Sequence, residues 1–426
     1  MATVELTQQK PGDYQLLVDG KPYFIQGAGL EFGPMSALAA CGGNTFRTWR
    51  VANGQQSAEQ VLDEAEALGL KVCMGLELAR ERHGFDYSDA KAVAGQHAEI
   101  MTDVQRLKDH PALIMWGLGN ELNLRATNPR VWDAVEALCQ SIKIVDPNHL
   151  VTTMLAGIDA PTLAAISARA PSLDLLSFQL YGEIDQLPEL LEALDYAGPY
   201  QITEWGPTGH WESPMTDWGR PIEATSHGKA GDIARRYRDV ILQQRPQCLG
   251  SYIFLWGQKQ ERTPTWYGLF LDSGRRTEAV DIMEHAWTGH WPEQRCPQIE
   301  DLLLNRKTAA QGVTLEAGSE AAGEVVFTAA QDSACSLSWQ VREEVDHKLE
   351  SDGGDFEPTP PCLIKSGDSG DSGESRFVFE APRPGEYRLY CQVDDNGEGS
   401  AVANIPFLVT PRETGASAGL SEASVV

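Results

Sequence analysis

The sequence predicts an α/β protein in which a (βα)8 TIM barrel is followed by a C-terminal immunoglobulin-like β-sandwich. Up to about residue 291, short apolar or β-branched runs alternate with amphipathic stretches, a pattern typical of parallel strands joined by helices. Beyond that point the chain changes to short strands separated by Gly, Ser and Pro turns. The length of 426 residues suits a large barrel with a smaller partner domain.

The barrel elements follow from these periodicities in chain order. Eight strands in about 270 residues fit a closed barrel better than the alternative, an open doubly wound sheet, because length and strand count both agree. A stretch around 34–41 provides the shortest crossover. The expected strands are 22–31, 44–50, 71–79, 113–121, 149–157, 174–182, 200–206 and 248–257, and the expected helices are 57–69, 89–109, 129–145, 161–170, 187–196, 224–244 and 277–290.

Smaller segments flank the barrel at both ends. Asp19-Gly20 lies between two apolar runs, which is a strong signal for a tight hairpin. The C-terminal part alternates as sandwich strands do. The expected sandwich strands are 324–329, 336–342, 376–380, 387–393 and 401–409. The expected domains are an N-terminal hairpin segment at 1–21, the barrel at 22–295, the sandwich at 310–412 and a flexible tail at 413–426.

Composition excludes several partners. The 34 Lys and Arg residues against 61 Asp and Glu give a net charge of −27, which repels nucleic acid and anionic lipid. No run reaches the roughly 18 apolar residues of a membrane span, and the first twenty residues lack the features of an export signal. We therefore expect no nucleic acid partner, no membrane span and a cytoplasmic location, or a periplasmic or secreted one if a leader was removed. The oligomeric state is not predicted.

Cysteines and an acidic loop leave two structural alternatives open. The eight cysteines form no CxxC pair, which favours buried thiols, but Cys335 and Cys391 could bridge two sheets in an oxidising compartment. Residues 351–373 are rich in Gly, Asp and Ser, and we expect a mobile loop there. Its aspartates could hold calcium, although a solvated acidic loop is the favoured interpretation. These aspartates are Asp352, Asp355, Asp368 and Asp371.

The barrel prediction locates the chemistry, because barrel enzymes keep their active sites at the C-terminal ends of the strands. The side chains at those ends are Arg47, Glu77, Asn120, Glu121, Tyr181, Glu204, Trp205 and Trp256. Retaining cleavage of a glycosidic bond needs a carboxylic acid and a nucleophilic carboxylate about 5 to 5.5 Å apart. Glu121 and Glu204 are 83 residues apart and meet only in a closed barrel. The structural alternative is that Glu121 caps a loop and Glu204 lies on the surface.

A resemblance sharpens this interpretation. The segment 110–121, His-Pro-Ala-Leu-Ile-Met-Trp-Gly-Leu-Gly-Asn-Glu, resembles the acid/base strand of clan A retaining glycoside hydrolases, and Thr203-Glu204-Trp205-Gly206 resembles their nucleophile strand. Segments 44–48 and 174–181 resemble the strands that carry an arginine and a tyrosine in that clan. The likeness covers about residues 22–290 and is closest to the barrels of families 2 and 5.

The resemblance implies a role for each side chain. Glu121 would be the acid/base and Glu204 the nucleophile, while Asn120 would hold the sugar 2-hydroxyl. Arg47 and Tyr181 would keep Glu204 charged and oriented.

It also implies a floor for the cleaved sugar, supplied by Trp256. The sequence departs from family 2 in two ways. Few residues precede the first strand, where family 2 enzymes usually have β-domains. Trp49-Arg50 stands where many members have Ser-His.

Tryptophan distribution also favours a carbohydrate groove. Seven of the 11 tryptophans lie between residues 205 and 291, and indole faces stack on the apolar faces of sugar rings. We expect Trp205 and Trp211 to contact substrate, and Glu77 to accept hydrogen bonds from its hydroxyls. Trp211, Trp218 and Trp266 fit either a subsite platform or a loop core. Further candidate acceptors are Glu31, His83, Asp86, Asn123 and Glu183.

The sequence contains no motif typical of serine hydrolases, zinc hydrolases or dinucleotide-binding enzymes. The sequence has no GxSxG and no HExxH, and the glycines at 27–33 are wrongly spaced for a dinucleotide loop. We therefore predict a retaining β-glycosidase that needs no cofactor and no metal. Its substrate would be a β-linked, glucan-like oligo- or polysaccharide, cleaved by double displacement through a glycosyl-enzyme intermediate. The alternatives are a transglycosylase with the same residues and a non-catalytic carbohydrate-binding protein; sugar, linkage and exo or endo action are not predicted.

Overall fold

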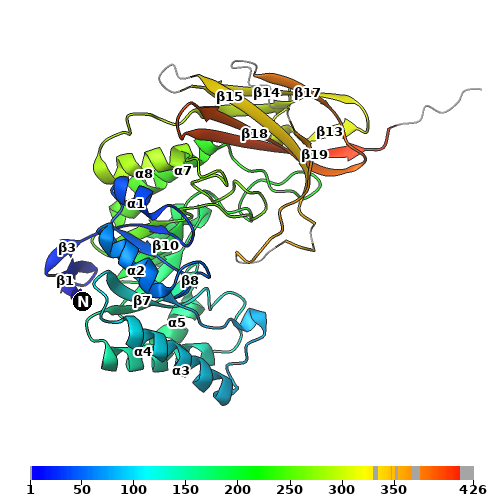
Figure 1. Cartoon of the computed structure of the whole chain (residues 1–426). Helices are drawn as coiled ribbons and strands as arrows, with labels where there is room; N and C mark the ends of the chain where they lie inside the picture. Colours follow the sequence, from blue (N-terminus) through cyan, green and yellow to red (C-terminus); the bar gives the residue numbers. More distant parts are fainter. Residues whose placement is uncertain (1, 330–333, 347, 351–353, 366–374, 413–426) are drawn as a thin grey trace, which may run out of the picture.

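The structure is a computed structural model that describes residues 2–329, 334–346, 348–350, 354–365 and 375–412. It consists of a barrel surrounded by helices, drawn below in Figure 1, and two packed sheets, drawn above. The expected tail at 413–426 and residues 351–353 and 366–373 of the expected mobile loop lie outside the described residues. The mobile-loop expectation is wrong for the rest of that range, because residues 354–365 are described and end in a strand, β16 (Cys362–Lys365). Asp352, Asp368 and Asp371 also lie outside the described residues, so calcium binding by these aspartates stays untested.

Eight parallel strands close into the predicted barrel. The pairing order β10-β11-β4-β5-β6-β7-β8-β9 returns to its start, which confirms the closed barrel over the open sheet. The strands are nearly all buried on both faces, as expected of parallel strands covered by helices. Their bounds are β4 (Ile25–Gly29), β5 (Thr45–Arg47), β6 (Lys71–Leu76), β7 (Leu113–Asn120), β8 (Leu150–Ala156), β9 (Leu176–Gln179), β10 (Tyr200–Trp205) and β11 (Cys248–Ile253).

Helices cover the outside of the barrel, and side chains of their first residues fix where several of them begin. Ser57 forms a capping box with Gln60, and the Asp89, Asp159 and Thr225 side chains each accept from a backbone N–H of the first turn. The helices are α1 (Met35–Ala40), α2 (Ala58–Ala67), α3 (Ala90–Leu107), α4 (Arg130–Val145), α5 (Ala160–Arg169), α6 (Leu187–Ala193), α7 (Ser226–Arg236) and α8 (Glu278–Thr288). The helix expected at 224–244 ends early, because a π-helical turn (Tyr237–Ile241) and a 3-10 turn (Leu242–Gln244) follow α7.

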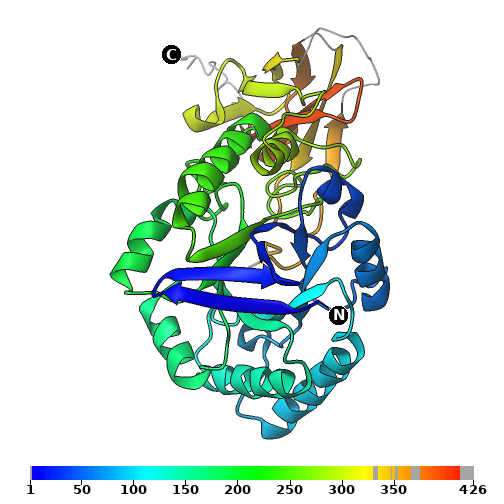
Figure 2. The same cartoon turned by 90° about the vertical axis from the view of Figure 1, so that its left-hand side faces the viewer.

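A small antiparallel sheet closes the N-terminal end of the barrel. It contains β1 (Val4–Lys10), β2 (Asp13–Val18) and β3 (Lys21–Tyr23), and the expected Asp19-Gly20 turn joins the last two with both residues at positive φ. Figure 2 shows its two longer strands lying across the barrel. Apolar residues of the sheet pack against the starts of the barrel strands, which seals this end and leaves the other end for chemistry.

The C-terminal domain is a two-sheet sandwich, as predicted. One sheet has the order β12-β14-β17 and the other β13-β19-β18-β15-β16. Tyr387 donates its hydroxyl to the Arg383 carbonyl at 2.8 Å, the tyrosine corner typical of immunoglobulin-like domains. The strands are β12 (Gln298–Leu304), β13 (Val313–Glu316), β14 (Glu320–Thr328), β15 (Cys335–Glu343), β16 (Cys362–Lys365), β17 (Arg376–Glu380), β18 (Gly385–Asp395) and β19 (Ser400–Thr410). The first of them begins before residue 310, where we expected the domain to start.

The suggested bridge between Cys335 and Cys391 does not form. Both residues lie on neighbouring strands of one sheet, where β15 and β18 pair Cys335 with Asp395 and Cys391 with Trp339. The two cysteines therefore stand several residues out of register, too far apart for a disulfide.

Polar contacts join the sandwich to the loop that follows β10. Arg220 of that loop pairs with Glu350 and Glu386 of the sandwich. The Arg388 guanidinium, itself 1% exposed, donates to the Pro221 carbonyl at 2.9 Å. Because buried charges need such partners, the loop and the sandwich depend on each other for a satisfied interface.

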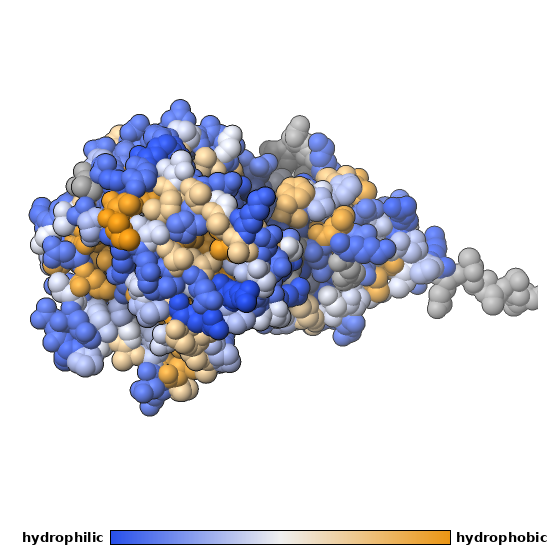
Figure 3. Space-filling view, turned by 90° about the horizontal axis from the view of Figure 1, so that it is seen from below, coloured by the Kyte–Doolittle hydropathy of each residue, from blue (hydrophilic) through white to orange (hydrophobic). Residues whose placement is uncertain are grey.

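Figure 3 shows one face of the molecule, mainly hydrophilic with small scattered apolar patches. Within the described ranges, none of the helices is both long and apolar enough to cross a membrane.

Candidate active site

The C-terminal ends of the barrel strands open into a cavity of about 610 Å³. Seven of the nine side chains predicted for the site line it directly. They are Glu77, Asn120, Glu121, Tyr181, Glu204, Trp211 and Trp256. Arg47 lies beneath the cavity and contacts Glu204, so eight of the nine are at the site: seven follow from the strand-end rule and Trp211 from the distribution of tryptophans. The structural alternative for Glu121 and Glu204 does not hold, since both face one pocket.

Irregular backbone at the end of β7 directs Glu121 into the cavity. The pairing with β8 shifts register between Leu118 and Asn120, and Gly119 and Glu121 adopt positive φ angles of 69° and 53°. A Cβ on residue 119 would lie 2.7 Å from Leu122, so only glycine fits there. A non-glycine residue in the left-handed region costs about 1–2 kcal/mol, and such outliers concentrate at functional sites.

The surroundings of Glu121 favour its protonated form. Burial, reinforced by the negative charge of Glu204, raises the pKa of Glu121 to about 7, although Arg82 and Arg80 pull the pKa of this carboxyl downwards. Arg82 donates to the Glu121 carboxylate at 3.4 Å and to its backbone carbonyl at 3.2 Å. A carboxyl group with such a pKa is suited to act as a general acid near neutral pH.

The Glu204 carboxylate accepts hydrogen bonds on both of its oxygens. One carboxylate oxygen accepts hydrogen bonds from Trp49 Nε1 at 2.8 Å, Gln179 Nε2 at 3.0 Å and Arg47 Nη1 at 3.3 Å. The other accepts from the Tyr181 hydroxyl at 2.8 Å. Burial and the Glu204 charge raise the pKa of Tyr181 well above its ordinary value, so this hydroxyl keeps its proton and donates. Four donors thus fix this carboxylate in one orientation.

Asn120 belongs to the same network. Its Oδ1 accepts from Gln179 Nε2 at 2.7 Å and from Arg47 Nη2 at 2.8 Å. Because the oxygen accepts both bonds, the amide nitrogen is left to face the cavity as a donor. The implied contact of Asn120 with a sugar hydroxyl fits this arrangement.

Aromatic side chains form the floor and one wall of the cavity. Trp256 is fully buried within the floor, and its Nε1 donates to the Pro34 carbonyl at 3.1 Å. Trp211 is 55% exposed and packs edge-on against Tyr181 with ring centroids 5.4 Å apart. Both therefore stand where the sequence placed them, one as a floor and one as an open platform.

Trp205 is not where we expected it. Its side chain is fully buried and stacks on Tyr237 of the helical layer, at 5.8 Å between ring centroids and 17° between planes. Successive residues of a strand point to opposite faces, so Glu204 facing the pocket requires Trp205 to face outwards. Trp205 supports the barrel wall and does not contact substrate.

Three residues of the site were missed from the sequence. Gln179 is the last residue of β9 and faces the pocket, so the strand-end rule could have found it. Trp49 lies two residues beyond the end of β5, outside any strand of the structure. Trp49 is one of the two residues that depart from family 2, and its indole binds the predicted nucleophile. Arg82 lies on a 3-10 turn (Glu81–His83), for which no periodic signal exists.

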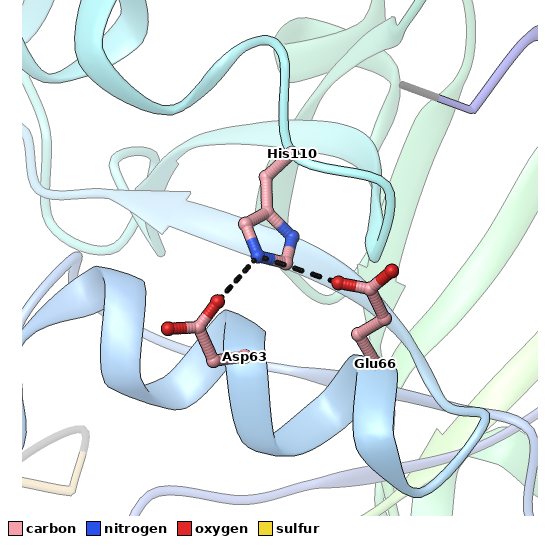
Figure 4. Close-up of side chains that lie close together, drawn as sticks. All are labelled: Asp63, Glu66 and His110. Carbon is pink, nitrogen blue, oxygen red and sulfur yellow. Dashed lines mark hydrogen bonds and ion pairs between the residues drawn. The ribbon is translucent and has the colours of Figure 1, made fainter.

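A cluster of possible metal ligands lies away from this cavity. Among the described residues, Asp63, Glu66 and His110 come close enough together to hold an ion (Figure 4). His110 Nδ1 accepts from the Ala112 backbone N–H at 3.1 Å, so in the neutral ring the proton lies on Nε2. Nε2 is 3.1 Å from Asp63 and donates to it, which accounts for the cluster as a contact between α2 and the segment before β7.

Comparison with known proteins relates the central part of the barrel to a known family. A model of the glycosyl hydrolases family 2 TIM barrel domain matches residues 59–208, a range that includes Glu121 and Glu204. Mannan endo-1,4-beta-mannosidase F of Aspergillus clavatus is 31% identical over 129 residues, 27% of this chain and 29% of the relative. Beta-glucuronidase of Sus scrofa is 27% identical over 171 residues, 35% of this chain and 24% of the relative. The chain thus matches about a quarter to a third of these relatives' length.

Solved structures show the same fold. A beta-glucuronidase 2 of Bacteroides uniformis, covalently bound to cyclophellitol-6-carboxylate aziridine, aligns with a TM-score of 0.53 at 14% identity, covering 96% of this chain and 48% of that one. A beta-glucuronidase of Bifidobacterium dentium aligns with a TM-score of 0.53 at 17% identity, covering 68% and 49%. The barrel of this chain therefore has the fold of the clan A TIM-barrel glycoside hydrolases, and its central part matches the barrel domain of family 2.

Proposed function

We propose that this protein is a retaining β-glycosidase that hydrolyses a β-linked oligo- or polysaccharide, glucan-like or related. One observation carries the proposal: a carboxylate fixed by four donors and a carboxyl group with a raised pKa face the same cavity. Curated relatives are named for mannan and for glucuronides, so β-mannosides and β-glucuronides belong in the first substrate panel alongside β-glucosides.

In the first step, Glu204 attacks the anomeric carbon while the Glu121 proton passes to the glycosidic oxygen. The bond to the leaving sugar breaks, and a glycosyl ester of Glu204 remains. In the second step, Glu121 removes a proton from water, whose oxygen attacks the same carbon and releases Glu204. Asn120 would donate to the 2-hydroxyl, a bond that strengthens in the transition state.

The charge of Glu204 explains how one residue serves both steps. As an anion, Glu204 helps to raise the pKa of Glu121, so the acid starts protonated. Once Glu204 is esterified, its charge is gone and the pKa of Glu121 falls, because a nearby negative charge no longer opposes ionisation. Glu121 is then ionised and able to act as the base.

The pH dependence of the first step follows from this assignment. We expect kcat/KM to fall about tenfold per pH unit above a pKa of about 7, because only protonated Glu121 donates. Arg82→Gln removes a charge that lowers the pKa of Glu121, so its basic limb should move to higher pH. Initial rates on one β-glycoside across neutral pH measure the basic limb of the wild-type protein and that of the variant. A basic limb that stays at the same pH in Arg82→Gln would contradict Glu121 as the titrating acid.

The proposal is tested by trapping the intermediate. A 2-deoxy-2-fluoro glycosyl fluoride slows both steps, but its reactive leaving group keeps the first step the faster one, so the glycosyl-enzyme accumulates. Using gluco, manno and glucuronyl probes, peptide mass spectrometry should find the label on Glu204, and Glu204→Gln should take none. Active turnover that gives first the α-anomer, or a label elsewhere, would contradict the retaining mechanism.

Experiments on the wild-type protein distinguish the two alternatives, a transglycosylase and a non-catalytic carbohydrate-binding protein. Exposed Trp211 at the cavity offers a platform for an acceptor sugar, which favours transglycosylation as the second candidate. Product analysis with added acceptor distinguishes the two, because a transglycosylase makes longer products in place of hydrolysis. A protein that binds sugars but neither turns over nor labels would be the non-catalytic alternative, against which the intact Glu121 and Glu204 network speaks.

A further inference from the structure

A segment of the C-terminal domain reaches the mouth of the barrel cavity. The connection between β15 and β16 leaves the sandwich and descends beside the barrel, opposite the side of β1 and β3 (Figure 1). Its residues Gly354, Asp355 and Phe356 line the same cavity as Glu121 and Glu204. The pocket is therefore built by both domains.

Residues after β11 hold one side of this segment. Lys259 Nζ donates to the Gly354 carbonyl at 2.6 Å. Glu357, only 1% exposed, accepts from the Arg262 backbone N–H at 2.5 Å and pairs with the Arg262 guanidinium. A buried carboxylate with such partners fixes the backbone next to Phe356.

Residues after β6 hold the other side and place the segment near the acid/base. The Asp355 carboxylate lies 3.4 Å from Arg80 Nη1 and 3.0 Å from His83 Nε2. Arg80 also donates through Nε to the Asn120 carbonyl at 3.1 Å. The Arg80 side chain thus connects Asp355 with the strand end that carries Asn120 and Glu121.

The Phe356 ring is exposed despite this firm backbone. It is 88% exposed, more than any other large apolar side chain in the described part of the chain. An exposed aromatic face at a cavity suits the apolar face of a sugar ring, while the adjacent Asp355 carboxylate suits a sugar hydroxyl. The pairing of an apolar face with a hydroxyl acceptor fits a pyranose better than a purely aromatic aglycone.

We infer that Asp355 and Phe356 form a subsite, supplied by the C-terminal domain, for the sugar on the leaving side of the cleaved bond. The inference rests on the proposed function, because it takes Glu121 as the acid that protonates this sugar. In the second half of the reaction, the same subsite would receive an acceptor sugar in place of the departed one. Phe356 acts here as a specificity-determining residue for substrates of two or more sugars.

The test compares two substrates with the same sugar at the cleaved position. A β-linked disaccharide fills the leaving-side subsite, whereas a β-glycosyl fluoride leaves it empty. Phe356→Ala should lower kcat/KM for the disaccharide by about fivefold to tenfold and leave the fluoride unchanged, because one ring stacking is lost only when the subsite is filled. Phe356→Trp should retain the disaccharide activity, and Leu363→Ala, an exposed apolar residue of β16, is the matched control.

The outcomes separate this inference from the function beneath it. An unchanged disaccharide rate in Phe356→Ala, or equal losses on both substrates, overturns the subsite while β-glycosidase activity stands. A wild-type protein that cleaves neither substrate, with any sugar of the panel, overturns the proposed function itself. Selective loss on the disaccharide, restored in Phe356→Trp, supports the subsite.

Discussion

Glu204→Ala is expected to lower kcat on β-glycosides by on the order of 10⁴-fold or more, the effect of removing a covalent nucleophile. Added azide should restore part of the turnover, because the shorter side chain leaves room for a small anion at the anomeric carbon. Azide would attack from the Glu204 side while Glu121 protonates the leaving group, so the product is the α-glycosyl azide. Rates and product NMR with an activated β-glycoside measure both effects.

The control for this variant removes a carboxylate elsewhere. Glu189→Ala alters an exposed residue of α6 and changes the net charge equally, and it should keep wild-type rates. Glu204→Gln, which keeps the side-chain size and one of the two acceptor oxygens that Tyr181 and Trp49 use, separates loss of chemistry from loss of folding. A Glu204→Ala protein with substantial activity, or a β-glycosyl azide as its product, would contradict the nucleophile assignment.

Glu121→Ala is expected to produce a loss that depends on the leaving group. For a disaccharide, whose leaving oxygen needs a proton, the rate should fall by about 10²–10⁴-fold. For a dinitrophenyl glycoside, whose leaving group departs unprotonated, the first step should change far less. Kinetics on a series of aryl glycosides measure this as a steeper dependence of kcat/KM on leaving-group acidity.

Glu121→Ala also gives a stereochemical prediction, the configuration of the product formed with added azide. Here azide would attack the glycosyl ester of Glu204 from the face opposite that residue, so the product is the β-glycosyl azide. This is the opposite anomer to the product expected from Glu204→Ala. The basic limb of the pH profile should also disappear. A loss of equal size for all leaving groups would show that Glu121 supports the fold and does not donate a proton.

The barrel was predictable because its signal is local. Alternating strands and helices repeat along the sequence, and closure follows from their number and order. The site residues at strand ends followed from the same rule, and Trp205 failed only because neighbouring residues on a strand face opposite ways. The roles of Asn120, Glu121 and Glu204 came from resemblance to a known clan, because the position of a residue in a sequence does not distinguish a catalytic carboxylate from a structural one.

Other parts had no local signal. The sandwich strands β12, β13 and β16 were missed, since the last two have four residues each and the first lies close behind the barrel. Arg82 belongs to a loop, and the contact of Asp355 with His83 joins residues 272 positions apart. Contacts of this kind form only when the two domains pack together, so the periodicity of either domain's sequence does not predict them.

The joint construction of the pocket has an evolutionary consequence. Glu121 and Glu204 belong to the barrel, whereas part of the cavity lining belongs to a connection in the C-terminal domain. Such a connection tolerates changes in length and composition that a barrel strand does not. New sugar preferences could therefore arise in this lineage by remodelling a distant module, with the reaction centre inherited unaltered.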